Sequence, residues 1–329
     1  MNTSQNYPIR PPLLRKGDTV GLVAPASPLI DLRDISRAKK VLAGLGFRVV
    51  EGRYIRRRHG FLAGADSERT ADIHRMFENR SVNAVMALRG GYGSARILDS
   101  LDWELIRSNP KVLVGHSDLT ALLNAVHQRT GLVTFWGPQA GYDLGRCPSP
   151  FKTRHLLSVI GRAQAPLPLP SSPPSPRRKL KVLSGGRAEG RLTGGNLSII
   201  TSLLGTPYEI DTSGRIFFFE DVDEEPYKID RMLNQLAQAG KLREAAGVIV
   251  GRCVDCESSG RMKRSFRLAD VLEHWLAPLG KPAIYGLPVG HEQDKLTLPI
   301  GVKALLEAGD TTGVTLLEPS VTADGGHAG

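Results

Sequence analysis

Cysteine, aromatic residues and long apolar runs are all scarce in this chain of 329 residues. The three cysteines form an odd set in a long chain, which excludes a disulfide framework and favours a reducing compartment. The longest apolar runs span only a few residues, against the ~18 that a membrane-spanning helix requires. The first 15 residues contain no apolar segment that would serve as a signal-peptide core. We therefore expect a cytoplasmic protein that does not engage a membrane.

The chain is strongly basic but poor in aromatic side chains. Its 43 lysines and arginines exceed its 33 acidic residues, which gives a net charge of +10, while aromatics make up only 6%. Such a charge attracts nucleic acid, anionic membranes or small acidic substrates. Because the basic clusters lack the interleaved aromatics on which bases stack, we expect no nucleic-acid partner. We interpret the excess charge as solvated surface that assists the capture of acidic peptides.

Two of the cysteines, Cys253 and Cys256, have a C-x-x-C spacing. No second pair of ligands completes a zinc site, so we predict no metal here. We interpret both residues as small apolar side chains that follow a strand.

The order of sequence patterns predicts an α/β protein with two domains. Between residues 19 and 162, short β-rich runs alternate with amphipathic stretches, which is typical of a parallel sheet covered by helices. Residues 163–178 contain six prolines, a composition that favours extended, solvated backbone. We therefore predict an N-terminal α/β domain over residues 1–162, a proline-rich linker over 163–187, and a smaller mixed domain over 188–329.

A serine stands at a predicted strand-to-helix turn. Ser117 follows a short apolar run and precedes the amphipathic stretch that begins at Leu119. The backbone N–H of Asp118 would lie at the helix N-terminus, where unpaired amides stabilise an oxyanion. This is the geometry of a nucleophile elbow, although Leu119 replaces the final glycine of G-x-S-x-G. A plain helix cap by Ser117 or Asp118 is the alternative.

A glycine-rich turn follows another predicted strand at Arg89, Gly90 and Gly91. Its glycines permit positive φ angles and close approach of the backbone to a ligand. The spacing does not match the dinucleotide fingerprint G-x-G-x-x-G. We retain three interpretations, namely an oxyanion hole, a phosphate cradle and a plain tight turn.

A carboxylate and a histidine complete a candidate catalytic set with Ser117. Glu220 is the first acidic residue after the apolar run of residues 217–219, and His291 lies in a loop after another predicted strand. A serine hydroxyl needs an imidazole to accept its proton, and the imidazole needs a carboxylate on its other nitrogen. His116, beside Ser117, is a rival base.

Six motifs in order along the chain resemble those of the LD-carboxypeptidase family, which also includes self-immunity peptidases against microcin-type antibiotics. The motifs are residues 17–20 with 24–27, 89–93, 115–120, 193–197, 220–231 and 290–291. The resemblance implies a flavodoxin-like parallel sheet in the N-terminal domain and a β-rich, barrel-like sheet in the C-terminal domain. It also implies a homodimer and no metal or organic cofactor.

The resemblance assigns catalytic roles by motif. It implies that Ser117 is the nucleophile, His291 the general base and Glu220 the carboxylate that orients it. Asp118 supplies an oxyanion-hole amide, together with the turn at Gly90 and Gly91. The family releases a terminal D-alanine from a cytoplasmic murein tetrapeptide, so the implied partner is a small murein peptide.

Three further residues are predicted to contact substrate. A carboxypeptidase must hold a free carboxylate, for which arginine is well suited, and Arg89 and Arg231 each adjoin a candidate motif. Trp136 is the candidate for stacking on a base if the substrate is an aminoacyl nucleotide. Two rival functions stay open, namely such an immunity peptidase and a non-catalytic module that binds nucleotide or nucleic acid.

Overall fold

The computed structural model describes residues 8–173, 179–258 and 265–323. The start of the N-terminal segment and residues 174–178 of the predicted linker lie outside these ranges. The chain divides into two compact units. The N-terminal unit comprises the described residues of Met1–Gln164, Thr297–Gly301 and Pro319–Gly329, and the C-terminal unit comprises those of Ala165–Leu296 and Val302–Glu318.

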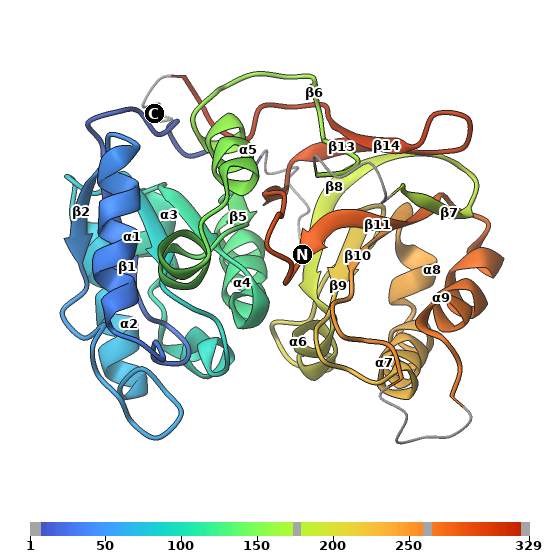
Figure 1. Ribbon diagram of the computed structural model, residues 1–329, viewed down its shortest axis with the longest axis horizontal. Helices are drawn as coiled ribbons and strands as arrows, with labels where there is room; N and C mark the ends of the chain where they lie inside the picture. The colour runs from blue at the N-terminus through green and yellow to red at the C-terminus, as the bar shows by residue number, and fades with distance from the viewer. Residues whose placement is uncertain (1–7, 174–178, 259–264, 324–329) are drawn as a thin grey trace. The chain divides into compact units, whose positions relative to one another are not determined.

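The N-terminal unit is built on a six-stranded sheet with the order β12-β5-β4-β3-β1-β2. Figure 1 labels β1, β2 and β5 of this sheet. Its strands are β1 (Thr19–Val23), β2 (Arg48–Glu51), β3 (Ala84–Ala87), β4 (Val112–Gly115), β5 (Thr134–Trp136) and β12 (Leu298–Ile300). Strands β1 to β5 are parallel, and β12 joins β5 antiparallel. The order 2-1-3-4-5 is that of a flavodoxin-like sheet, so the predicted α/β class is confirmed.

Helices cover both faces of this sheet. They are α1 (Arg33–Gly44), α2 (Asp66–Glu78), α3 (Trp103–Ser108), α4 (Thr120–Thr130) and α5 (Pro150–Ile160), with short helical turns η1 (Ser94–Ser100), η2 (Ser117–Leu119) and η3 (Ala140–Arg146). Right-handed crossovers place α1 on one face and α2, α3 and α4 on the other. In agreement, α3 contacts both α2 and α4, whereas α1 packs on η3. Strands β1, β3 and β4 are consequently buried along their whole length.

The C-terminal unit contains an eight-stranded mixed sheet with the order β6-β14-β13-β8-β9-β10-β11-β7. Its strands are β6 (Leu167–Pro168), β7 (Lys181–Ser184), β8 (Gly186–Asn196), β9 (Ile216–Glu220), β10 (Gly247–Arg252), β11 (Ala283–Gly290), β13 (Lys303–Ala308) and β14 (Gly313–Leu316). Strands β8 to β11 are parallel, and the outer strands are antiparallel to their neighbours.

The core of the C-terminal unit lies between the parallel strands and a layer of helices. These helices are α6 (Leu197–Ser202), α7 (Pro226–Gln238), α8 (Lys241–Glu244), α9 (Leu268–Leu276) and η4 (Ala277–Leu279). Alternate residues of β9 and β10, such as Phe217, Phe219 and Val248, pack in one cluster with Leu233 of α7 and Leu272 of α9. Within the described ranges, no helix is both long and apolar enough to span a membrane.

The boundaries between the two units differ from those predicted from the sequence. The segment predicted as a linker, residues 163–187, contains β6 and β7 of the second sheet. Proline is tolerated in β6 because this strand is at the sheet edge, where Pro168 pairs with Thr315. Residues 297–301 leave the C-terminal unit, and β12 pairs with β5 through Leu298 and Trp136.

Parallel strands bring candidate residues together at their carboxyl ends. Strands β8, β9 and β10 end at Asn196, Glu220 and Arg252, and His291 follows the last residue of β11. Because these four strands are adjacent and parallel, their carboxyl ends form one edge of the C-terminal sheet. Ligands bind preferentially at such edges in α/β proteins.

Candidate active site

Ser117 occupies a strained turn between β4 and α4. Its φ is +62°, a left-handed conformation that non-glycine residues adopt infrequently. Such backbone strain, of order 1–3 kcal/mol, is concentrated at functional sites. The residue follows β4 by two positions and begins η2, so the chain makes the strand-to-helix turn of a nucleophile elbow.

The glycine-rich turn lies directly against this serine. A Cβ placed on Gly90 would come within 2.9 Å of the Ser117 Cβ and 3.0 Å of the Gln139 Nε2. Gly91 has φ of +101°, and a Cβ there would clash with Ser27 at 2.6 Å. The close approach of this backbone to Ser117 therefore depends on glycine at position 90, and its approach to Ser27 depends on glycine at position 91.

Asp118 anchors the same turn with its side chain. Its buried carboxylate accepts hydrogen bonds from the backbone N–H groups of Gly93 at 3.2 Å and Ser94 at 2.8 Å. The Ser94 hydroxyl donates to the Asp118 carbonyl oxygen at 2.6 Å. Burial raises the pKa of Asp118, and the hydrogen bonds from Ser94 and Gly93 oppose that rise. Asp118 thus holds the elbow and the glycine turn together.

His116 and Trp136 belong to the interior of the N-terminal unit. The His116 ring packs on the Trp136 ring, and its Nε2 lies 3.4 Å from the Asp143 carboxylate. Trp136 is fully buried and its indole N–H donates to the Thr120 hydroxyl at 3.2 Å. The prediction that Trp136 contacts substrate is therefore corrected, because its ring is enclosed. His116 has a packed, internal environment rather than that of an exposed base.

Glu220 and His291 form a hydrogen-bonded pair in the C-terminal unit. Nδ1 of His291 lies 2.8 Å from Oε2 of Glu220, whose side chain is fully buried at the end of β9. In the neutral ring this bond places the proton on Nδ1, so that Nε2 carries the basic lone pair. Gly290 lets the chain approach, since a Cβ there would lie 2.4 Å from the Arg252 carbonyl oxygen.

The environment of His291 favours its charged form. Burial is the largest single influence on the pKa of His291 and lowers it. The charge and the hydrogen bond of Glu220 act in the opposite direction, with help from Asp221. The net result is a pKa above the ordinary value of 6.5, as expected for an imidazole beside a carboxylate.

Asn196 organises the two carboxylates behind this histidine. Its Nδ2 donates to Oδ1 of Asp221 at 2.9 Å and to Oε1 of Glu220 at 3.3 Å. Its Oδ1 caps α6 by accepting the Ile199 N–H at 3.2 Å. Asp221 also accepts two hydrogen bonds from Ser198, at 2.9 and 2.7 Å. Burial, followed by the charge of Glu220, raises the pKa of Asp221.

Several of these positioning residues were not singled out from the sequence. Asn196 stands in one of the family motifs, residues 193–197, at the end of β8, and that motif is the signal that points to it. Gln139 and Asp143 have no such signal. The Gln139 side chain donates to the His116 carbonyl oxygen at 2.8 Å, and its N–H donates to Asp143 at 2.9 Å.

The two arginines predicted to bind substrate have different surroundings. Arg89 is partly buried and donates to the Pro28 carbonyl oxygen at 3.0 Å, so it braces the loop after β1. Arg231 is exposed on α7, one turn beyond Lys228. The described residues contain no group of three or more histidine, cysteine, aspartate or glutamate side chains that would hold a metal ion.

Comparison with known proteins identifies the family of the chain. Residues 20–137 match the LD-carboxypeptidase N-terminal domain, and residues 189–306 match the LD-carboxypeptidase C-terminal domain. The chain belongs to the LD-carboxypeptidase family. It is therefore a serine carboxypeptidase, a hydrolase, as the family resemblance predicts.

Individual relatives of this LD-carboxypeptidase support the same assignment. The chain is 44% identical to the probable murein peptide carboxypeptidase of Bacillus subtilis, over 94% of this chain and 95% of the relative. The muramoyltetrapeptide carboxypeptidase of Oxalobacter formigenes is 32% identical, with a TM-score of 0.78 over 90% of this chain and 97% of that structure. A third relative is the microcin C7 self-immunity protein MccF of Escherichia coli, whose structure contains aspartyl sulfamoyl adenosine. That structure is 25% identical to this chain, with a TM-score of 0.86, and the match covers 96% of this chain and 100% of MccF.

Proposed function

We propose that this enzyme hydrolyses the amide between the L-centre of diaminopimelate and the terminal D-alanine of a murein tetrapeptide, in peptidoglycan recycling. The observation that carries the proposal is the hydrogen bond between His291 and the buried Glu220 carboxylate, at 2.8 Å. A general base needs such a partner to fix its tautomer and to stabilise its charged form. The likeness to murein peptide carboxypeptidases supports this choice of substrate.

In the proposed reaction, Ser117 is the nucleophile. Nε2 of His291 accepts the Ser117 proton while the serine oxygen attacks the amide carbonyl. The backbone N–H of Asp118 and the turn at Gly90 donate to the resulting oxyanion. His291 then gives its proton to the departing D-alanine amine, and water hydrolyses the acyl-enzyme through the same base.

A related substrate, an aminoacyl nucleotide, is the second candidate. The likeness to MccF, whose structure with aspartyl sulfamoyl adenosine is known, favours it. Recognition of a nucleotide base commonly uses an aromatic ring that is open to stacking. The enclosed position of Trp136 removes the one aromatic residue proposed for that task, so we favour the murein peptide.

The experiment that tests the proposal compares the two substrates in one assay. The purified enzyme and its Ser117→Ala variant are incubated with murein tetrapeptide and with an aminoacyl sulfamoyl adenosine, and products are identified by mass spectrometry. We expect D-alanine release that Ser117→Ala abolishes. A matched control is Ser108→Ala, an exposed serine on α3, which should retain full activity.

The outcomes of this assay separate the candidates. Cleavage of the adenylate alone would assign the immunity function instead. Activity that survives Ser117→Ala would refute the proposed nucleophile. The expected cytoplasmic location and homodimer stay predictions, which fractionation of cells and sedimentation of the purified protein would test.

A further inference from the structure

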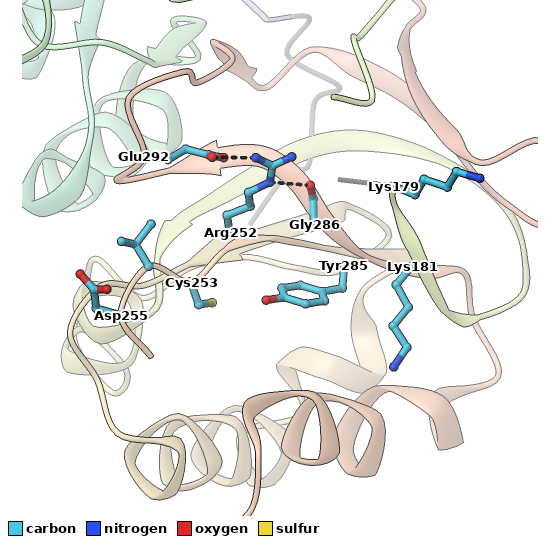
Figure 2. Close-up of a pocket in the computed structure, with 9 residues that line it drawn as sticks. Lys179, Lys181, Arg252, Cys253, Asp255, Tyr285, Gly286 and Glu292 are labelled. Carbon is cyan, nitrogen blue, oxygen red and sulfur yellow. Dashed lines mark hydrogen bonds and ion pairs between the residues drawn. The ribbon is translucent and has the colours of Figure 1, made fainter. Parts of the chain in front are cut away.

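The C-terminal unit contains a cavity whose lining includes Glu292, the residue that follows the proposed base. Its volume is about 500 Å³, and charged and polar side chains line much of its wall. Lys179, Arg252, Asp255, Tyr285 and Glu292 are among them (Figure 2). A cavity of this size holds a small polar ligand or one long side chain.

Arg252 is the most constrained residue of this wall. It is 8% exposed, at the end of β10. Nη1 lies 2.7 Å from Oε2 of Glu292, and Nε donates to the Gly286 carbonyl oxygen at 3.1 Å (Figure 2). Nη2 is buried and has no hydrogen-bond partner among the residues that the structure describes. A buried donor without an acceptor is unfavourable by about 1–3 kcal/mol. An anionic ligand that accepts a hydrogen bond from this guanidinium would remove that cost.

The wall carries charges of both signs. Its cations are Lys179, Lys181 and Arg252, and its anions are Asp255 and Glu292. Lys181 is already paired with Glu273, which is not among the lining residues. Burial raises the pKa of Tyr285 to about 12, so its hydroxyl stays protonated and both donates and accepts hydrogen bonds. An apolar ligand would leave these groups unsatisfied, and a simple anion would use only the cations. The lining therefore fits a zwitterion, with an ammonium and a carboxylate on one carbon.

Two residues of the cavity wall, Glu292 and Arg252, are neighbours of His291 or of the residue before it. Glu292 follows His291 directly, and consecutive Cα atoms are about 3.8 Å apart. Arg252 pairs with Gly290 in the register of β10 and β11. These two relations, along the chain and between β10 and β11, connect the cavity with the proposed base.

We propose that this cavity binds the free end of the diaminopimelate side chain, with its carboxylate on Arg252 and its ammonium on Asp255 and Glu292. The inference rests on the proposed function and adds the residues that select the third residue of the peptide. A lysine at that peptide position keeps the ammonium but lacks the second carboxylate. Arg252 would then keep its unpaired nitrogen, and binding would be weaker.

The test measures kcat/KM for two tetrapeptides that differ only in diaminopimelate or lysine at the third position. We expect the wild-type enzyme to prefer diaminopimelate by about tenfold or more, the usual effect of a hydrogen bond to a charged group. The variant Arg252→Met with Glu292→Gln removes both buried charges together, because removal of one alone leaves the other unpaired. We expect its selectivity ratio to fall to about one.

Two further variants keep the test decisive. Lys179→Met alters an exposed residue of the wall, so folding should be unaffected, and it should reduce the ratio by a smaller factor. Lys303→Met removes a lysine whose ion pair with Glu189 is outside the cavity wall, and it should leave the ratio unchanged.

The failures of the inference and of the proposed function differ. A wild-type enzyme that cleaves both peptides equally would overturn the inference, and so would an equal loss of both activities in the double variant. A structural role of Arg252 predicts that equal loss. A wild-type enzyme that cleaves neither peptide would instead overturn the proposed function, and the inference with it.

Discussion

Nδ1 of His291 lies 2.8 Å from Oε2 of Glu220, although 71 positions separate the two residues in the chain. The pair depends on the adjacency of β9, β10 and β11, whose carboxyl ends form one edge. We predict that Glu220→Gln lowers kcat by about 10³-fold or more, because the amide no longer stabilises the imidazolium. Steady-state kinetics on the tetrapeptide measure this loss. Glu189→Gln, at an exposed glutamate, is the matched control and should have no effect.

The pH profile should report the same interaction. His291 acts as a base only when neutral, and its pKa is raised above 6.5, so kcat/KM should rise with pH through that higher value. In Glu220→Gln the residual activity should rise at lower pH, because the lowering of the pKa by burial is then opposed only by the charge of Asp221. An unchanged acidic limb in the variant would contradict the assignment of His291 as the base.

The contribution of the His291–Glu220 pair to stability should decrease with rising pH, whereas the activity should increase. The folded pKa of His291 exceeds the unfolded one, so the stabilisation from its protonation is complete below pH of about 6.5. It is lost as the pH rises through the folded pKa. Urea unfolding of the wild type and of Glu220→Gln at several pH values measures this difference, which should shrink as the medium becomes alkaline.

Asn196 should contribute to stability through two distinct interactions. Asn196→Ala removes the cap of α6, worth about 0.5–2 kcal/mol, and removes the side-chain amide that donates to both Asp221 and Glu220. We expect the free energy of unfolding to fall by about 2–4 kcal/mol in total. Asn196→Asp keeps the capping oxygen but adds a third carboxylate beside Glu220 and Asp221. We therefore expect Asn196→Asp to be less stable than Asn196→Ala at neutral pH. The reverse order in urea unfolding would show that capping dominates.

Gly290 should tolerate no side chain. Its φ is +148°, and a Cβ would lie 2.4 Å from the Arg252 carbonyl oxygen and 3.3 Å from Oε2 of Glu220. We expect Gly290→Ala to displace His291 and to lower both kcat and the melting temperature. Gly280→Ala is a matched control with φ of +62° and open space around it, and it should lose only about 1 kcal/mol from the backbone. Equal melting temperatures would refute the steric argument.

Asp118 should act on catalysis by holding the glycine turn. Asp118→Asn replaces one acceptor oxygen with an NH₂ group that faces the N–H donors of Gly93 and Ser94. We expect the turn to loosen and kcat to fall by about 10²-fold, the effect of losing one oxyanion-hole donor. KM should change little. A proportional rise in KM with unchanged kcat would indicate a role in substrate binding instead.

Local sequence patterns were sufficient to predict most elements of the fold. The apolar run at residues 19–23 is β1, and the amphipathic stretch from Leu119 corresponds to α4. Ser117 was predictable as an elbow because a strand and a helix flank it within a few residues. Arg252 and Asn196 were harder to recognise, since their roles depend on neighbours from other strands.

The sequence by itself determined the α/β class and the position of Ser117 between a strand and a helix. It also supplied Glu220 and His291 as the candidate carboxylate and base for Ser117. These features follow from periodicity and from the backbone preferences of nearby residues. Only the tertiary structure decided that Trp136 is enclosed, that β12 joins the first sheet, and that Asn196 bridges Glu220 and Asp221. Strand pairing brings together residues that are distant in the chain, so no local pattern specifies these contacts.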